Sequence, residues 1–582
     1  MITSDQFAAG KGTESTLQAS KTGTLHRILQ IGAKYDTLYT LRREEVLCLF
    51  VVSTVNKYYI YVYVNCSLFI LTFQCRIADI LTLQVTEQIS HYQTGEARMT
   101  KKLRGETTLS SNDGSASVVE GEKLPQYLAA LSATLGALCL GGVLGWSAAG
   151  GTSGEKLAEQ YNIAMSISDF SWIGSIANLG AAAICIPMGL MMDAFGRKRS
   201  MLMLVVPYTI GWSFVIWANS VAMFCVGRFL LGFSGGGFCV AVPVYTAEIG
   251  EMTIRGRLGA FYELMLTFGT LISYILSPLI PIYYLSITFA VVPLIFFTVF
   301  SFMPESPTYY LMKGREEEAR ASLLRVRGPK YDIERELQAR KSALVAELRY
   351  RGSFLSAMKT RVAIKGLSIA YGLMFFKQMS GVNAIIFYTG SMFSENGSIS
   401  MDLSTIIVGI LQVVATFISV LTVDKLGRKV LLFGSMAAMA LGMFSLGIFY
   451  YLEHIGVDVS SITWLPLASV CFFILVCGLG AGPIPFMMVG ELFSPQIKGI
   501  AGSSACSLNW LITFLVTRTY NDLVSTFGNY ATFWLYGLIC ALGVIFVVLI
   551  VPETKGKPLE QIQRELGAKT IPVSEDISLT HS

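Results

Sequence analysis

The sequence predicts an all-α membrane protein in which twelve transmembrane helices form two six-helix pseudo-repeat bundles, joined by a cytoplasmic helical insert. Three observations lead to this fold class. Of the 582 residues, 53% are hydrophobic and only 14% are charged, whereas soluble domains carry about 25% charged residues. Twelve apolar stretches are long enough to cross a bilayer, and one set of polar motifs occurs twice along the chain. A soluble chain of this length would keep a charged surface, and a disordered chain would be polar.

A helix needs about 20 apolar residues to cross the hydrocarbon core of a bilayer. From Gln126 onward, six spans are expected at about residues 126–149, 168–192, 200–219, 221–247, 258–280 and 282–303. After a polar stretch, six more are expected at about residues 361–392, 402–423, 430–452, 463–490, 500–525 and 531–551.

The positions of Lys and Arg predict how these spans are oriented, because short cytoplasmic loops carry an excess of basic residues. The gaps after even-numbered spans are basic, as in Arg197-Lys198-Arg199 and Arg428-Lys429, whereas the gap between the first two spans holds only Lys156. Both ends of the twelve-span body are therefore expected in the cytoplasm, with the body in the plasma membrane.

Residues 1–125 are expected to form a cytoplasmic N-terminal segment. Its apolar stretch at 46–74 is interrupted by Asn56-Lys57 and Asn65, and it lacks the cleavage site of a signal peptide. A true span there would place residue 1 outside the cell, so we expect weak insertion or a segment outside the functional body. Met99 opens a basic leader, which motivates the hypothesis of an alternative start at that residue.

The remaining boundaries follow from the spans. Residues 126–307 form the first bundle, 308–360 the insert, 361–556 the second bundle and 557–582 a cytoplasmic tail. Opposite charges three and four residues apart in the insert, as in Glu316-Glu317-Glu318-Ala319-Arg320, indicate exposed helices. The insert is either a simple linker or a cytoplasmic gate that latches the two halves together.

Three polar motifs recur in the same order in both halves. Asp193-Ala-Phe-Gly-Arg197-Lys198 is repeated as Asp424-Lys-Leu-Gly-Arg428-Lys429, Glu248 before Arg255 as Glu491 before Lys498, and Pro304-Glu305-Ser306 as Pro552-Glu553-Thr554. Such a repeat around a central axis is typical of transporters.

These charged residues are expected to form ion pairs between helix ends. We expect the pairs to exist while the cytoplasmic side is closed and to break when it opens, so that they bias a two-state equilibrium. The alternative is that the basic residues act only as orientation signals. The expected gating residues are Asp193, Arg197, Arg228, Glu248, Arg255, Asp424, Arg428, Glu491 and Lys498.

Over about residues 125–565 the sequence resembles the sugar-porter branch of the major facilitator superfamily. The matching motifs are the repeated loops above together with Gly227-Arg228, Pro243-Val-Tyr-Thr-Ala-Glu248, Gln378-Met-Ser-Gly-Val-Asn383, Gly482-Pro-Ile-Pro485 and Pro552-Glu-Thr-Lys-Gly556. Leu144-Gly-Trp-Ser147 is most similar to the animal facilitated trehalose and glucose transporters. The resemblance implies twelve helices in two bundles, the major facilitator fold.

Polar residues within membrane spans point to a substrate site, because they are costly in lipid. Amide side chains offer both donors and acceptors, which suits neutral hydroxyl groups. The resemblance implies that Gln378 and Asn383 bind sugar and that Gln412, Asn509 and Thr513 line the cavity. Phe486 follows a helix break at Gly482-Pro483-Ile484-Pro485 and offers an aromatic face to a sugar ring.

Two substrate positions depart from the family pattern. Lys377 and Glu263 stand where the family usually carries glutamine. Because a lone charge in the membrane is costly, we expect these two residues to form an ion pair in the cavity. The alternative is that Glu263 takes up a proton during transport, since burial raises the pKa of a carboxyl group.

The sequence favours a facilitative sugar transporter that works by alternating access and carries trehalose or a hexose such as glucose. The first span lacks the acid of related proton-coupled porters, which favours passive transport. Phe486 and Gly478 replace the usual Trp and Glu of glucose facilitators, so the choice between hexose and disaccharide stays open. Lys498 replaces the usual Arg, which weakens the expected gate pair. The alternatives are a proton-coupled symporter that uses Glu263 and a sensor that binds sugar without transporting it.

No enzyme activity, cofactor or metal site is expected. Most of the 11 cysteines lie within apolar stretches without ligand spacing, where they act as small hydrophobic residues. The net charge of +5 lies mostly in loops, so the expected partners are a small-molecule sugar and the lipid bilayer, not nucleic acid. Asn396-Gly397-Ser398 is a glycosylation motif in an expected outward loop.

Overall fold

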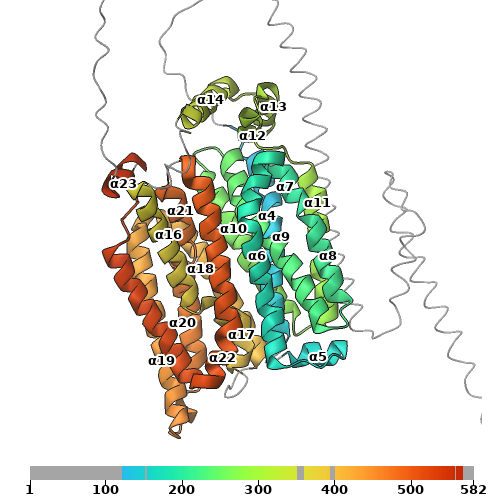
Figure 1. The fold of residues 1–582 in the computed structure, drawn as a ribbon, viewed down its shortest axis with the longest axis vertical. Coiled ribbons are helices and arrows are strands. Elements are labelled where there is room, and N and C mark those ends of the chain that lie inside the picture. Colours follow the sequence, from blue (N-terminus) through green and yellow to red (C-terminus); the bar gives the residue numbers. More distant parts are fainter. Residues whose placement is uncertain are drawn as a thin grey trace, which may run out of the picture. The chain divides into compact units, whose positions relative to one another are not determined.

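The apolar runs of the sequence become helices that pack into two bundles (Figure 1). This computed structural model describes residues 121–150, 154–349, 360–393, 400–493, 495–557 and 559–567. All of them lie in one unit of the chain, residues 115–582. The N-terminal stretch at 46–74, Met99, Asn396 and the side chain of Asp424 lie outside the described residues.

The first bundle contains the six expected spans, and the third of them is divided into α7 and α8. The helices are α4 (Leu124–Ala149), α5 (Glu155–Tyr161), α6 (Ile167–Phe195), α7 (Arg197–Met203), α8 (Val205–Ile216), α9 (Val221–Ile249), α10 (Arg255–Leu276) and α11 (Ile282–Ser301). The short α5 lies between the first two spans. Helix α6 begins with a capping box in which Ser166 and Asp169 satisfy each other's backbone N–H groups.

The insert forms three helices, whereas the charge pattern predicted exposed helices without giving their number. They are α12 (Pro307–Met312), α13 (Glu316–Arg327) and α14 (Ile333–Arg349). Between described residues, the hydrogen bonds that leave the insert go to the first bundle. Arg327 and Arg340 donate to the backbone carbonyls of Ile249 and Glu248 at the end of α9, at 2.6 and 2.9 Å. The insert is thus docked on one half rather than latched across both.

The second bundle contains the remaining six expected spans. Its helices are α16 (Arg361–Met379), α17 (Val382–Phe393), α18 (Met401–Leu426), α19 (Arg428–His454), the short 3₁₀ helix η1 (Ser460–Ile462), α20 (Leu465–Leu479), α21 (Ile484–Leu492), α22 (Pro495–Leu549) and α23 (Leu559–Glu565).

Ten helical segments among the described residues are long and apolar enough to cross a membrane. The last of these, Ile497–Leu549, holds both the eleventh and twelfth expected spans, which are separated by non-helical backbone at Gly528. The seventh expected span is missing from the ten because it is divided into α16 and α17. Counting Ile497–Leu549 as two spans and adding the divided seventh span gives the twelve expected spans.

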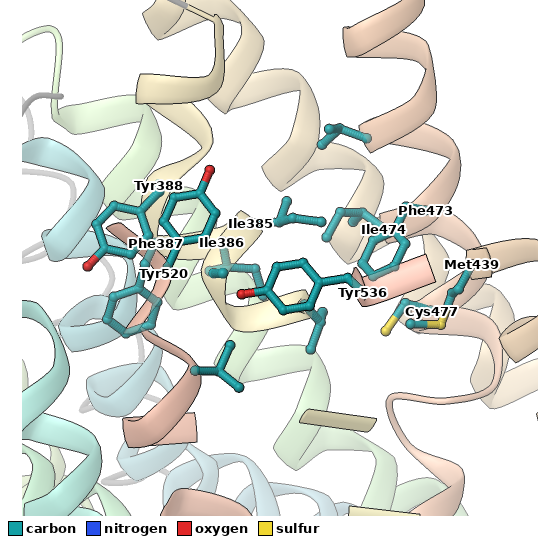
Figure 2. Close-up of a cluster of buried hydrophobic side chains, with 14 of the residues drawn as sticks. Ile385, Ile386, Phe387, Tyr388, Met439, Phe473, Ile474, Cys477, Tyr520 and Tyr536 are labelled. Carbon is teal, nitrogen blue, oxygen red and sulfur yellow. The ribbon is translucent and has the colours of Figure 1, made fainter. Parts of the chain in front are cut away.

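The seventh span breaks at Gly381, which has a φ of +83°. A Cβ atom there would lie 2.6 Å from Cδ2 of Tyr536, so both the backbone conformation and the close approach require glycine. After the break, α17 carries Ile385, Ile386 and Tyr388 into a cluster of buried apolar side chains, where the rings of Tyr388 and Tyr520 stack with centroids 5.0 Å apart (Figure 2).

The two bundles meet along a small number of helices. Within the described residues, α6 of the first bundle packs against α22 of the second, α10 packs against α18, and α4 packs against α17. These contacts bring the expected substrate residues of α10, α16, α18 and α22 to one interface.

Candidate functional site

A cavity of about 100 Å³ lies between the two bundles. It brings seven of the eight expected substrate residues to one place. The expected residues that line it are Glu263, Lys377, Gln378, Asn383, Gln412, Phe486 and Asn509. Thr513 is fully buried and is not part of the wall.

Lys377 and Thr513 are placed differently from what the sequence predicts. Lys377 lines the cavity, but its ammonium group is directed to a backbone carbonyl, as described below. Thr513 lies behind the wall, where its hydroxyl donates to the backbone carbonyl of Asn509 at 2.8 Å and accepts from Asn383 Nδ2 at 3.4 Å. Thr513 therefore supports a cavity residue instead of lining the cavity, which corrects the expectation from the sequence.

The amide residues of the cavity are held in a hydrogen-bonded chain. Gln378 Nε2 donates to Asn509 Oδ1 at 2.6 Å, and Asn383 Nδ2 donates to Gln378 Oε1. The chain links α16, α17 and α22 across the break at Gly381. Because each amide keeps spare donors or acceptors after these bonds, the chain can present fixed polar groups to a ligand.

Three further residues bring buried polar atoms without a partner to the same cavity. Tyr262 Oη, Gln412 Oε1 and Trp510 Nε1 are buried and have no hydrogen-bond partner among the described residues, and all three residues line the cavity. A buried polar group without a partner costs about 1–3 kcal/mol. These atoms are therefore positioned to gain from a ligand that is rich in hydroxyl groups.

Lys377 is buried, with a relative exposure of 8%. Its Nζ donates to the backbone carbonyl of Gly482 at 2.7 Å and lies 4.4 Å from the centre of the Phe486 ring. These contacts tie α16 to the break between α20 and α21. A charge-assisted hydrogen bond and a cation–π contact both stabilise a buried ammonium group.

The expected ion pair between Glu263 and Lys377 is not formed in this structure. Both residues line the cavity, but the ion pairs between described residues do not include one that joins them. The Gly482 carbonyl and the Phe486 ring stabilise the ammonium group in place of the carboxylate. The Glu263 carboxylate remains available to accept hydrogen bonds from a ligand.

The gating residues of the first bundle form a compact network at the end that carries the insert, here called the insert end. Arg197 Nη2 lies 2.9 Å from Glu248 Oε1, and Arg197 Nη1 lies 3.6 Å from Asp193 Oδ1. The other Glu248 oxygen accepts from the Ser306 hydroxyl. Glu305 accepts from the backbone N–H groups of Arg197 and Lys198, each at 3.0 Å.

The second bundle repeats this network atom by atom. Arg428 Nη2 lies 3.1 Å from Glu491 Oε1, and the Thr554 hydroxyl donates to Glu491 Oε2 at 2.5 Å. Glu553 accepts from the backbone N–H groups of Arg428 and Lys429, each at 3.0 Å. Burial opposes ionisation of Glu553, but these N–H bonds and those of Lys555 and Thr554 outweigh it and hold its pKa below the ordinary value.

Both gate pairs join helices within one bundle, not one bundle to the other. Arg197 and Glu248 belong to α7 and α9, and Arg428 and Glu491 belong to α19 and α21. The described part of the molecule has these residues at one end, and each pair lies inside its own half, which the sequence did not predict. The pairs stabilise each bundle as a unit.

Three other expected gating residues have no ion pair among the described residues. Arg228 is fully buried near the start of α9, where it donates to the backbone carbonyls of Val143 and Ile173, at 2.7 and 3.1 Å, and to the Ser147 hydroxyl. It therefore fastens α9 to α4 and α6. Arg255 and Lys498 lie close enough across the interface for the two cations to repel each other.

Contacts between the two bundles are concentrated away from the insert end. At the opposite end, Asn521 Nδ2 donates to Ser171 Oγ at 2.8 Å, and the guanidinium of Arg518 lies 5.1 Å from the centre of the Trp172 ring. Deeper in the interface, Asn178 Nδ2 donates to Thr517 Oγ1 at 3.1 Å.

These contacts between the bundles, here called the seal, extend to about the middle of α6, where Ser507 Oγ donates to the Ala182 carbonyl at 2.9 Å. Cys185 and Cys239 contact Cys506 at the same level. Beyond it, the hydrogen bonds and ion pairs between described residues do not join the bundles at the insert end. The described part of the molecule is thus closed at one end and unjoined at the other.

Some contributors to the site were not predicted from the sequence. Tyr262 and Trp510 are direct neighbours of the predicted residues Glu263 and Asn509, and that adjacency was the available signal. Glu305 and Glu553 stand within the repeated Pro-Glu motif, which marked them without assigning a role. The described residues contain no group of three His, Cys, Asp or Glu side chains suited to a metal ion.

Comparisons with known proteins agree with this geometry. Residues 108–566 match the family described as "Sugar (and other) transporter". A facilitated trehalose transporter from Polypedilum vanderplanki is 38% identical over 447 residues, which are 76% of this chain and 88% of that protein. Another, from Aedes aegypti, is 39% identical over 446 residues, 76% of this chain and 55% of that longer relative.

Solved structures show the same fold. A major facilitator superfamily proton:xylose symporter bound to 6-bromo-6-deoxy-D-glucose superposes with a TM-score of 0.65 at 26% identity, covering 76% of this chain and 99% of the symporter. An inward-open conformation of the xylose transporter from E. coli superposes with a TM-score of 0.63 at 25% identity, covering 75% and 98% of the two chains. The chain is a multi-pass membrane protein with the major facilitator fold, and it belongs to the family of sugar transporters.

Proposed function

We propose that this protein is a facilitative transporter that moves trehalose or a hexose such as glucose down its gradient by alternating access. One observation carries the proposal. Tyr262, Gln412 and Trp510 hold unpartnered buried polar atoms around a cavity between the two bundles, beside the amide chain of Gln378, Asn383 and Asn509. Such a wall suits a neutral polyhydroxyl ligand, whose hydroxyl groups both donate and accept hydrogen bonds.

The site residues divide the work of binding. The carboxylate oxygens of Glu263 accept a hydrogen bond from a hydroxyl group of the sugar. The amide chain supplies both donors and acceptors, and Phe486 offers an apolar ring face against the C–H groups of a sugar ring. Lys377 positions Phe486 through its contact with the ring at 4.4 Å.

The transport cycle follows from where the bundles are joined. In this conformation the end opposite the insert is sealed, and the seal must break when that end opens. Each gate network, Arg197 with Glu248 and Arg428 with Glu491, holds its own bundle together during this motion. The bundles thereby move against each other as rigid bodies around the cavity.

Orientation and location extend the same proposal. The basic residues of the insert end, which include Arg197, Lys198 and Arg428, favour its placement in the cytoplasm. The structure then corresponds to an inward-facing conformation. We place the protein in the plasma membrane, where a sugar transporter would move sugar between the cell and its surroundings.

The decisive experiment is uptake of labelled trehalose and labelled glucose into vesicles that contain the purified protein. We expect uptake of at least one sugar without a proton gradient and saturation with rising sugar concentration. Gln412→Leu should reduce uptake by about tenfold, because it removes a hydrogen-bonding group worth about 1.4 kcal/mol. Ser445→Ala is the matched control, since this hydroxyl is exposed and bonds its own helix.

One observation favours proton coupling as a second candidate. The Glu263 carboxylate lines the cavity without a counter-ion among the described residues. Uptake that requires an inward proton gradient, and that becomes independent of it in Glu263→Gln, would establish the symporter. Binding of either sugar without uptake under any gradient would instead establish a sensor.

A further inference from the structure

Three cysteines from both bundles meet at the inner edge of the seal. Cys506 Sγ lies 3.5 Å from Cys185 Sγ and 3.5 Å from Cys239 Sγ. Cys185 belongs to α6 and Cys239 to α9, in the first bundle, whereas Cys506 belongs to α22 in the second. Each of these sulfur contacts therefore joins one half of the molecule to the other.

The three thiols differ in access. Cys185 and Cys506 are buried, while Cys239 is half-buried and lines the cavity. A small uncharged oxidant that enters the cavity therefore meets Cys239 first. The sulfur of the buried Cys506 is in van der Waals contact with the sulfur of Cys239. A half-buried thiol that borders the cavity thus lies in direct contact with a buried thiol of the other bundle.

We propose that Cys239 and Cys506 form an oxidisable thiol pair whose disulfide locks the two bundles together. Peroxide oxidises the Cys239 thiol to a sulfenic acid and is itself reduced to one molecule of water. The Cys506 thiol then attacks that sulfur, the S–S bond forms, the S–O bond breaks, and a second water leaves. The two thiols lose two electrons in total, and peroxide gains them.

The geometry demands little movement for this bond. The sulfur atoms must approach by about 1.5 Å to reach the length of a disulfide, and the neighbouring bond from Ser507 to the Ala182 carbonyl already holds the helices close at 2.9 Å. The bond would cross the interface that must open in each transport cycle. Oxidation would therefore stop transport, and reduction by a thiol would restore it.

The covalent link can be detected apart from transport. A protease recognition sequence placed within residues 350–359 of the full-length protein allows the chain to be cut between the bundles after treatment with hydrogen peroxide. On a non-reducing gel we expect the two fragments to remain joined, and to separate after addition of dithiothreitol. Separate fragments without reductant would overturn the proposal.

Matched cysteine variants test whether the link runs through Cys506. Cys506→Ser should abolish the joined species, because Cys506 is the shared partner, and Cys506→Ala provides the same test if the serine variant does not fold. Cys540→Ser is the control, since Cys540 is also buried but is not part of the cluster. A joined species that persists without Cys506 would contradict the assignment. Loss of the joined species in Cys540→Ser would contradict it as well.

The effect on transport rests on the proposed function, whereas the link itself does not. Peroxide should reduce sugar uptake in step with the joined fraction, and Cys506→Ser should take up sugar and resist peroxide. A joined species without loss of uptake would overturn the locking role. A joined species in a protein that transports neither sugar would leave the thiol pair intact and refute the transport proposal alone.

Discussion

The Lys377 side chain shows how a single buried charge can position a binding site. Its ammonium group is bonded to the Gly482 carbonyl at 2.7 Å and lies against the Phe486 ring. The glutamine that the family usually carries here would be shorter and neutral. Lys377 thus connects the broken seventh span to the break in the tenth, and both breaks border the cavity.

Removing this charge should weaken sugar binding more than turnover. Lys377→Met leaves the Gly482 carbonyl without its donor and frees the Phe486 ring. Because a hydrogen bond to a charged group contributes about 1.5–3 kcal/mol, we expect KM for uptake to rise by about tenfold or more, with a smaller change in kcat. Lys365→Met, on an exposed position of the same helix, is the control. An unchanged KM in Lys377→Met would contradict this role.

The relation between Glu263 and Lys377 can be measured by a double-mutant cycle. Since the structure shows no ion pair between them, the effects of Glu263→Gln and Lys377→Gln on KM should add, to within about 0.5 kcal/mol. Each single variant and the double variant are compared by uptake at equal amounts of protein in the vesicles. A double variant that transports better than Glu263→Gln alone would show that the pair forms at another stage of the cycle.

The predicted and unpredicted residues of the cavity differ in a physical sense. Gln378, Asn383, Gln412 and Asn509 could be predicted because amides inside a membrane span are costly and therefore conspicuous. Tyr262 and Trp510 could not, because amphipathic rings also occur in ordinary apolar packing. The missing contact between Glu263 and Lys377 depends on side-chain distances, which residue types alone do not determine.

Among the helical elements, the insert owes its docking to one carboxylate. Glu336 accepts from Arg327 Nε at 3.0 Å and from Arg340 Nη2 at 2.6 Å, and the same two arginines reach the carbonyls at the end of α9. Glu336 therefore holds together two cations that would otherwise repel each other. Burial opposes its ionisation, but the hydrogen bond and charge of Arg327 and the charge of Arg340 outweigh burial and lower its pKa.

The lowered pKa predicts how docking depends on pH. The ordinary pKa of a Glu carboxyl group is about 4.3. Because docking lowers the pKa of Glu336, the ionised carboxylate stabilises the docked insert at pH values above about 4.3. This stabilisation is lost as the pH falls below that value and the carboxylate becomes protonated. Glu336→Gln should loosen the insert already at neutral pH. We expect hydrogen exchange of the α14 backbone to be about tenfold faster in this variant.

The comparison for the insert is made at neutral pH against Glu317→Gln, a change of the same type in α13. Glu317 lies in the same insert, but the ion pairs and hydrogen bonds between described residues do not include its carboxylate. Equal exchange of α14 in both variants would show that the Glu336 contacts do not hold the insert in place. Hydrogen exchange of wild-type protein in acid, corrected for the intrinsic rate, tests the pH dependence.

At the scale of the helices, the sequence predicted which segments form helices better than it predicted which residues of different helices contact each other. The lengths and apolar character of the spans are local properties, so twelve segments could be counted. The partners of Arg228 could not be predicted, because carbonyls of α4 and α6 come within reach only after those helices pack. The same holds for the gate pairs, which close within each bundle.

Within the described residues, the two ends of the paired bundles differ in how they are joined, and like charges contribute to this difference. The two bundles are sealed at the end opposite the insert by contacts such as Ser171 with Asn521. At the insert end, Arg255 of the first bundle acts as a repelling neighbour of Lys498 in the second. We expect this repulsion to disfavour closure of that end and so to favour the conformation described here.

Reversing one of these charges should shift the two-state equilibrium. Lys498→Glu allows an ion pair with Arg255 across the insert end and so favours the conformation in which that end is closed. An exposed ion pair contributes up to about 1 kcal/mol, and relief of repulsion adds to it, so the population ratio should change by about tenfold. Uptake should fall, because a carrier held in one conformation completes fewer cycles. The joined species formed from Cys239 and Cys506 in peroxide should fall as well if closing the insert end separates those helices.

The double charge reversal separates this mechanism from simple damage. Arg255→Glu combined with Lys498→Glu restores two like charges across the interface, and we expect uptake to recover most of the way to the wild-type rate. Lys330→Glu, an equal change of charge at an exposed position of the insert, should leave uptake unchanged. If the double variant is as slow as Lys498→Glu alone, repulsion between positions 255 and 498 does not set the balance of the two conformations. Recovery would instead establish that two cations, which the sequence suggested as members of separate ion pairs, act together across the interface to keep one end of the transporter open.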